Sequence, residues 1–254
     1  MAELKEKPFF ALVGGDTLLA KEIRELLEKE NPAPRVELIS ATVDDAVVVA
    51  KAAFLGPQED EALVLSPLNA ASLAGAQVAF LAGSPASSRR ALKLNAKAKL
   101  ALIDLTGALE EQPTARLRAP SIEKTPPALP SDAAIHVIAH PAAIAIAELL
   151  SALASAGAIR RSIIHVFEPA SERGKKGLDE LQQQTVGVLS FKKLKMDVFD
   201  AQLGFNLLAR YGEEAEEPLE GIEQRIEKHL ASLLASGLAG ESLDRATYPC
   251  RRCA

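Results

Sequence analysis

The sequence contains no tryptophan and only two tyrosines among its 254 residues, and it has no long basic run. Aromatic side chains that could stack on bases are therefore scarce. The formal net charge of −5 at pH 7 also opposes attraction to phosphate backbones and to anionic lipid surfaces. We expect no nucleic-acid partner.

Cysteine is almost absent as well. The two cysteines, Cys250 and Cys253, both lie in the tail TYPCRRCA. A CxxC pair can be half of a zinc site or a redox pair, but these uses need a second pair of ligands or a folded helix N-terminus around the thiols. An incidental pair near a loose chain end is the favoured interpretation. We expect no metal site.

Long apolar runs are also missing. No uninterrupted run is long enough to span a bilayer, and residues 1–12 lack the apolar core of a signal peptide. The composition, 48% hydrophobic and 25% charged, is ordinary for a globular protein and too apolar for disorder. We expect a cytoplasmic protein without a membrane partner, of one large domain or two modest ones.

Strand-like and helix-like segments alternate through the first half of the chain. Phe9–Val13 is a short apolar run that ends at two glycines, and residues 18–27 then carry apolar side chains at helical spacing, with Asp16 as the expected cap. Further strands are expected at 36–39, 62–65, 78–81 and 100–103, and further helices at 45–54 and 85–96. This alternation predicts an α/β fold, with a parallel sheet covered on both faces.

The pattern breaks down between Thr106 and Asp132, where five prolines predict an irregular connection. Beyond it we expect strands at 135–138 and 162–167 and helices beginning near 141, 174 and 222.

The stretch from Ile135 to Ala147, IHVIAHPAAIAIA, predicts a buried strand that runs through a His-Pro turn into a helix. An α/β enzyme often places its nucleophile at such a turn, because the helix N-terminus lowers the pKa of a thiol and holds an oxyanion. Ala142 and Ala143 stand at the tip of this turn. The position for chemistry is therefore present without a nucleophile, an acid or a base.

Six segments, in order, resemble the motifs of the aspartate-semialdehyde dehydrogenase family, which includes the N-acetylglutamyl-phosphate reductases. The family's motifs V-G-A-T-G-x-V-G, F-x-A-G-G-S-x-S, V-I-D-N-S-S-A-F and A-N-P-N-C-[ST] are similar to VGGDTLLA, AFLAGSPAS, LIDLTGAL and AHPAAIA. The closest matches are HVFEPASERGKKGLDELQQQT and QLGFNLLA.

This resemblance covers nearly the whole chain and implies two domains. Residues 1–133 would form a Rossmann-like domain that binds NAD or NADP. Residues 134–254 would form a second, C-terminally truncated α+β domain that contains the substrate site and the dimer interface. The implied reaction, in amino-acid biosynthesis, reduces an acyl phosphate to an aldehyde through a cysteine thioester, with a histidine as acid and base. By the same resemblance we expect a homodimer.

The departures from the family pattern fall where the chemistry would be. Ala143 occupies the position of the cysteine, His140 that of the asparagine before the proline, and Glu168 that of the substrate-orienting glutamine. Ala142 and Leu105 replace two further asparagines. We therefore expect no catalytic residue.

The phosphate loop is also eroded, since Thr17 and Ala20 stand where the family has its second and third glycines. A Cβ at each position is expected to crowd a pyrophosphate and to weaken or abolish binding. A plain strand-to-helix turn and true nucleotide binding both stay open. If a nucleotide binds, the resemblance places it on Gly14, Gly15, Asp16, Thr17, Leu18, Gly83 and Ser84.

The remaining polar residues carry weaker signals. His140 is either a surviving catalytic group or a turn histidine bonded to backbone, and the second interpretation is favoured because no carboxylate adjoins it in sequence. His165 is expected to be a packed or edge residue of its strand. We expect solvent exposure for His229, for Lys175 and Lys176, and for the acidic loop EEAEE.

Three hypotheses for function follow. The first is an inactive relative of the dehydrogenases that persists as a structural or regulatory dimer. The second is a divergent NAD(P)-dependent oxidoreductase that acts on an aldehyde or an acyl phosphate through His140 and Glu168 without a covalent step. The third is a pseudogene-like fragment whose exposed sheet edge leaves it poorly folded. The tail from Leu238 also shows no strand or helix periodicity, as in a truncated or frame-shifted end.

Overall fold

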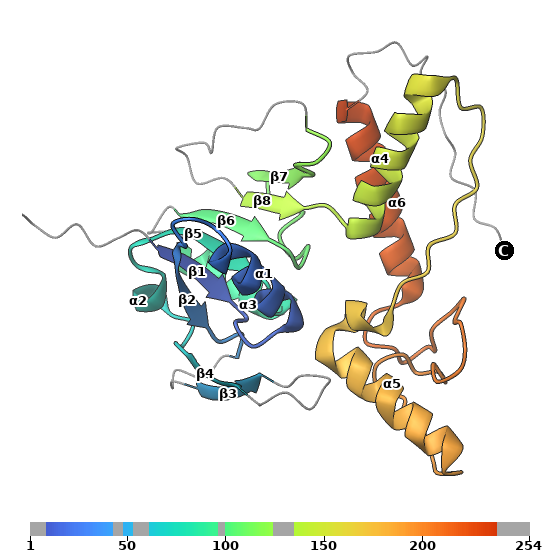
Figure 1. Cartoon of the computed structure of the whole chain (residues 1–254), viewed down its shortest axis with the longest axis horizontal. Helices are drawn as coiled ribbons and strands as arrows, with labels where there is room; N and C mark the ends of the chain where they lie inside the picture. Colours follow the sequence, from blue (N-terminus) through green and yellow to red (C-terminus); the bar gives the residue numbers. More distant parts are fainter. Residues whose placement is uncertain (1–8, 43–47, 53–60, 96–99, 124–134, 238–254) are drawn as a thin grey trace, which may run out of the picture. The chain divides into compact units, whose positions relative to one another are not determined.

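The computed structural model describes residues 9–42, 48–52, 61–95, 100–123 and 135–237 (Figure 1). The chain divides into two compact units: the first comprises residues 1–118 and 127–138, and the second residues 119–126 and 139–254. The expected domain boundary at 133/134 stays a prediction, and the strand that directly follows it lies in the sheet of the first unit.

The first unit is built on a six-stranded parallel sheet, which confirms the predicted α/β fold. Its strands are β1 (Phe9–Val13), β2 (Arg35–Ile39), β5 (Ala76–Leu81), β6 (Ala101–Asp104), β7 (Ala115–Arg118) and β8 (Ile135–Ile138). Their order is β2-β1-β5-β6-β8-β7, and every pair in the sheet is parallel. The order reverses between β1 and β5, so this sheet has the switch point at which open α/β folds bind ligands.

Helices cover both faces of this sheet because alternate residues of β1 point in opposite directions. Leu12 packs with Ala20 of α1 (Leu18–Glu28) on one face. On the other face Ala11 and Val13 pack with Ala91 of α3 (Pro85–Asn95). Both helices agree with the sequence prediction.

Two segments of the first unit differ from expectation. The helix expected at 45–54 is wrong for residues 48–52, since β3 (Val48–Ala52) pairs antiparallel with β4 (Glu61–Leu65) in a separate two-stranded sheet. A short apolar run with neighbouring valines suits either structure, and strand pairing decides between them. The strand β7 lies in the stretch expected to be irregular, and the short helix α2 (Ala70–Leu73) was not expected.

The second unit is helical in its described part. It holds α4 (Pro141–Ala156), the 3-10 helix η1 (Ala170–Arg173), α5 (Gly174–Leu189) and α6 (Leu219–Gly237). The helices α4, α5 and α6 follow the sequence prediction, whereas η1 was not expected. Helices α4 and α6 lie side by side (Figure 1). Ala143 and Ile146 of α4 and Ile222 and Leu233 of α6 are buried.

The strand expected at residues 162–167 is wrong. The segment forms no strand, and all of its residues are exposed. Its composition suits a strand, but a strand also needs a neighbouring strand that completes its hydrogen bonds. None of the described segments pairs with it.

Candidate functional site

The turns that follow β1 and β5 meet at the switch point of the first unit. Gly14 has a φ of 87°, and a Cβ at this residue would lie only 2.3 Å from the Cα of Gly83. Gly14 and Gly83, to which the resemblance assigns cofactor binding, therefore lie together at the edge where ligands bind in this class of sheet.

Thr17, and not the expected Asp16, caps α1. Its hydroxyl accepts the N–H of Ala20 at 3.1 Å and donates to the carbonyl of Ala82 at 3.0 Å. The prediction of Asp16 is wrong by one residue because the cap directly precedes the first helical residue, Leu18, and Asp16 is exposed. Ala20 is buried. The structure thus turns the Thr17 hydroxyl toward β5 and the Ala20 methyl into the core.

The backbone N–H groups of the glycine turn already form hydrogen bonds with the sheet. The N–H groups of Gly14 and Gly15 both donate to the carbonyl of Ile39, at 2.8 and 3.1 Å. A phosphate at this turn would therefore rely on the first turn of α1, which begins at Leu18. Ser84, in the neighbouring turn, receives the N–H of Ser87 at 3.2 Å and so caps α3.

The start of α4 has the predicted strand–turn–helix geometry. His140 is the N-cap, and its Nδ1 accepts the N–H of Ala142 at 3.3 Å. Ala143, in the first turn, is fully buried. The position of the expected nucleophile is therefore formed as the sequence predicts, and a methyl group fills it.

The fold brings a carboxylate and a second histidine to His140. Nε2 of His140 lies 3.5 Å from Oε1 of Glu168, although no carboxylate adjoins this histidine in sequence. The backbone N–H of His140 donates to Nδ1 of His229 at 2.9 Å. His229 is only 3% exposed, so its expected solvation is wrong; the reason is that its face of α6 packs against α4.

His140 is neutral at physiological pH. Its pKa is lowered from 6.5 to about 4, first by burial and then by Arg225, His229 and Arg173, against an upward effect of Glu217. Because Nδ1 accepts a backbone N–H, the single ring proton resides on Nε2 and faces the carboxylate of Glu168.

Burial also acts on Glu168. It raises the pKa of this carboxyl group, and the neighbouring charge of Glu172 raises it further, against the opposing effects of Arg173 and Arg225. The two partners of the pair are therefore both shifted toward their neutral forms, as expected for polar groups that share a poorly solvated place.

Two arginines share one carboxylate beside this pair. Arg173 binds Oε2 of Glu217, and Nη2 of Arg225 lies 3.3 Å from Oε1 of the same side chain. The acidic loop is exposed at Glu213, Glu214 and Glu216, as predicted, whereas Glu217 is only partly exposed because it pairs with η1 and α6. Sequence reasoning missed Glu217 and Arg225, which come from separate elements and carry no spacing signal. Lys175 and Lys176 are exposed, as predicted.

The shifted pKa of His140 makes a prediction about pH. Unfolded His140 takes up a proton below 6.5 and folded His140 only near 4, so the unfolded state binds more protons and acid favours unfolding. The stability due to neutral His140 is present above 6.5 and is lost as the pH falls toward 4. Between pH 7 and pH 5 we expect the original protein to lose about 2 kcal/mol more than His140→Asn. Urea unfolding at several pH values measures this difference.

His140→Asn suits this comparison because asparagine keeps a helix cap without titrating. Glu168 has the opposite linkage, since a raised carboxyl pKa favours the folded state in acid, but it is present in both proteins. His165→Asn is the matched control at an exposed histidine. Parallel stability curves for the original protein and His140→Asn would contradict the prediction.

The motif ELQQQT, residues 180–185, has a structural role. Glu180 and Gln184 of α5 are both buried, and together they bind six backbone groups of the segment 195–204. The carboxylate accepts the N–H groups of Val198 and Phe199, and the amide accepts those of Leu203 and Gly204 and donates to the carbonyls of Lys195 and Ala201. The ELQQQT part of this motif thus holds a loop in place.

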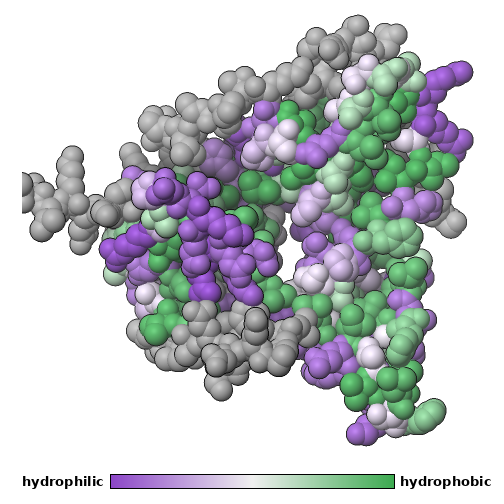
Figure 2. Space-filling view, viewed as in Figure 1, coloured by the Kyte–Doolittle hydropathy of each residue, from purple (hydrophilic) through white to green (hydrophobic). Residues whose placement is uncertain are grey.

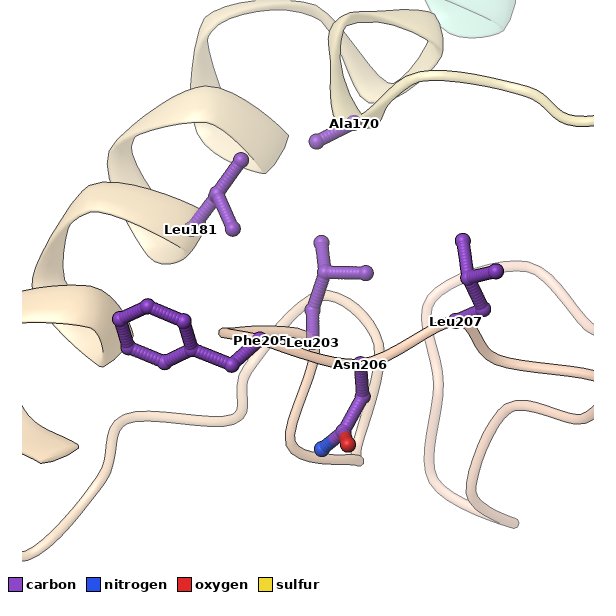
Figure 3. Close-up of a pocket in the computed structure, with 6 residues that line it drawn as sticks. All are labelled: Ala170, Leu181, Leu203, Phe205, Asn206 and Leu207. Carbon is purple, nitrogen blue, oxygen red and sulfur yellow. The ribbon is translucent and has the colours of Figure 1, made fainter.

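A shallow cavity of about 340 Å³ lies between η1, α5 and the segment 203–207 (Figure 3). Its lining is mostly apolar: Ala170, Leu181, Leu203, Phe205, Asn206 and Leu207. Asn206, its one polar side chain, donates to the carbonyl of Gln202 at 3.0 Å. The cavity therefore offers volume and apolar contact, without titratable groups.

No cluster of three or more His, Cys, Asp or Glu side chains in the part of the chain that the structure describes could hold a metal ion. None of the helices in that part of the chain is long and apolar enough to cross a membrane.

Comparison with solved structures identifies the class of fold. The chain superposes on a probable aspartate-semialdehyde dehydrogenase from Pseudomonas aeruginosa with a TM-score of 0.65 and 24% identity, over 91% of this chain and 67% of that one. Aspartate semialdehyde dehydrogenase II from Vibrio cholerae gives the same TM-score at 16% identity and the same coverage. The chain therefore has the fold of these enzymes, a Rossmann-like parallel sheet joined to a second unit.

Sequence comparison points to the same family. The chain is 31% identical over 159 residues to a USG-1 protein homolog from P. aeruginosa and 28% identical over 219 residues to one from Azotobacter vinelandii. It covers 46% and 62% of these relatives, and they match 62% and 85% of this chain. An aspartate-semialdehyde dehydrogenase from Rickettsia bellii is 30% identical over 105 residues, 41% of this chain and 31% of that protein.

No family model matches the chain. The chain spans less than two thirds of the length of these curated relatives. Fold and sequence together confirm the resemblance: the chain is similar in sequence to the aspartate-semialdehyde dehydrogenases and their relatives, and it has their fold.

Proposed function

We propose that this protein is a catalytically inactive relative of the aspartate-semialdehyde dehydrogenases that acts as a structural or regulatory homodimer. The observation that carries the proposal is Ala143, a fully buried alanine in the first turn of α4. Without a thiol at this turn no thioester forms. The reduction would then have to cross one high barrier, where a covalent intermediate would divide it into two lower ones.

The proposal includes weak or absent binding of NAD or NADP. Gly14 and Gly15 have already committed their N–H groups to Ile39, and Thr17 places a side chain where the family motif has a glycine. The site would be the pair of turns at the switch point, Gly14–Leu18 and Gly83–Ser84, which would bring a nucleotide to the carboxyl ends of β1 and β5. The scaffold role itself does not require occupancy of these turns.

Calorimetric titration with NAD and NADP, followed by assays with aldehydes and acyl phosphates, tests the proposal. We expect no saturable binding at micromolar nucleotide and no turnover. Turnover by the unaltered protein that disappears in His140→Ala would overturn it. Tight nucleotide binding without turnover would instead restrict the proposal to a nucleotide-binding scaffold.

The proximity of His140 and Glu168 favours a second candidate, a divergent NAD(P)-dependent oxidoreductase that uses this pair as acid and base. The 3.5 Å separation and the low exposure of both side chains, 8% and 18%, suit proton transfer. The pKa of His140 argues against it, because proton uptake at pH 7 by a base with a pKa of about 4 costs about 4 kcal/mol. A pH–rate profile that stays flat down to about pH 5 and depends on His140 would favour this candidate.

The homodimer is supported by the surface of the second unit. Most of the exposed large apolar side chains of the described residues lie there, and Figure 2 shows apolar surface along α5 and the segments around it. Contiguous exposed apolar surface commonly marks an interaction site. The side chains are Leu149, Leu153, Ile163, Ile164, Val166, Phe167, Val186, Leu189, Phe191, Met196, Phe205 and Leu207.

A further inference from the structure

The segment 160–168, RRSIIHVFE, runs as an open stretch between α4 and η1 (Figure 1). Residues 160–167 are all exposed. Within the described part of the chain none of these eight residues makes a backbone hydrogen bond. The segment therefore presents a row of backbone donors and acceptors to its surroundings.

The segment alternates like a strand. Ile163 and Phe167 are 68% and 75% exposed, whereas Ile164 and Val166, between them, are only 39% and 45% exposed. One set of side chains thus leans toward the unit and the other points away, which is the two-residue period of an extended chain. β-branched and aromatic residues with an unpaired backbone are the features of a sheet edge that accepts another strand.

We propose that residues 160–168 pair antiparallel with the same residues of a second copy, about a two-fold axis at Ile164. This inference rests on the homodimer of the proposed function and names its surface. The charges select the direction: Arg160 would lie opposite the partner's Glu168, and Arg161 opposite the partner's Phe167. Parallel pairing in register would instead place arginine beside arginine and glutamate beside glutamate.

The site beside Glu168 is compatible with this pairing. Only Oε1 of Glu168 faces His140, and Oε2 has no hydrogen-bond partner among the described residues. The self-complementary order of the segment, cationic at one end, apolar in the centre and acidic at the other, is what an isologous contact needs. Ile164 would face the partner's Ile164 across the axis.

Single cysteines test the register in a Cys250→Ser, Cys253→Ser background. Ile164→Cys lies opposite its own copy and is expected to form an intermolecular disulfide under mild oxidation, seen on a non-reducing gel. Ser162→Cys is the matched control: its two copies would be roughly 13 Å apart along the strands, beyond the reach of a disulfide. A mixture of Ser162→Cys and Val166→Cys proteins is expected to cross-link.

Light scattering separates the two proposals. A dimer that loses at least about tenfold in affinity in Ile164→Lys, but not in Leu189→Lys at another exposed residue of the same unit, supports the strand pairing. A dimer in which neither lysine acts and Ile164→Cys does not cross-link overturns the pairing and leaves the homodimer standing. A monomer at every concentration overturns both. Thermal melts of the variants confirm that each is folded.

Discussion

Replacing Gln184 by alanine is expected to destabilise the second unit by about 3 kcal/mol or more. The side chain is fully buried and makes four hydrogen bonds to the backbone of residues 195–204. Alanine would leave the N–H groups of Leu203 and Gly204 buried or forced to open to water, and each such group costs about 1–3 kcal/mol. The lost volume adds to this effect.

Urea unfolding followed by circular dichroism measures the change, and Gln183→Ala is the matched control. Gln183 stands next to Gln184 on α5 but is exposed, so its replacement is expected to alter stability by less than about 0.5 kcal/mol. Equal stabilities of the two variants would show that the segment 195–204 does not depend on this amide.

Much of the first unit could be predicted from the sequence because its signals are local. The apolar run Phe9–Val13, the glycines after it and the amphipathic residues 18–27 each have a period or a turn signal within a few residues. The apolar period is ambiguous at 48–52, and the strand at 115–118 is short. In both places pairing with another strand decides the secondary structure, and that strand lies outside the local sequence pattern.

The second unit shows the limit of such reasoning more sharply. The segment 162–167 has strand composition but lacks a described partner strand, so local propensity alone gave the wrong structure. His229 stands three residues after Ile226 and four before Leu233, so helical spacing places it on the apolar stripe of α6. The prediction of solvent exposure followed its polar neighbour Lys228 instead, and the packing of α6 on α4 buries it.

The position of the candidate site could be predicted from the sequence, but the side chains that surround His140 could not. The turn at His140 could be placed because strand, proline and helix follow one another directly in sequence. Its neighbours Glu168, His229 and Arg225 come from separate segments, and only the fold brings them together. The pKa of His140 depends on these neighbours, so its direction could not be derived from the turn alone.

Replacing Gly14 by alanine is expected to destabilise the first unit by about 2–5 kcal/mol, from a strained backbone and a clash together. The φ of 87° is a conformation that residues with a Cβ rarely adopt. The new methyl would also lie 2.3 Å from the Cα and 2.5 Å from the N of Gly83, so the two turns must separate.

Gly221→Ala is the matched control for this substitution. Gly221 lies in α6 with no atom within 4 Å of a Cβ, and alanine there is expected to stabilise the helix by up to about 1 kcal/mol. Guanidinium unfolding of both variants gives the comparison. A Cβ at Gly14 would meet backbone at 2.3 Å from a positive φ, whereas a Cβ at Gly15 would meet the Cβ of Leu38 at 2.9 Å and the Cδ2 of Leu65 at 3.1 Å, without a positive φ. Gly14→Ala should therefore cost more than Gly15→Ala, and the reverse order would mean that the turns after β1 and β5 are not in contact.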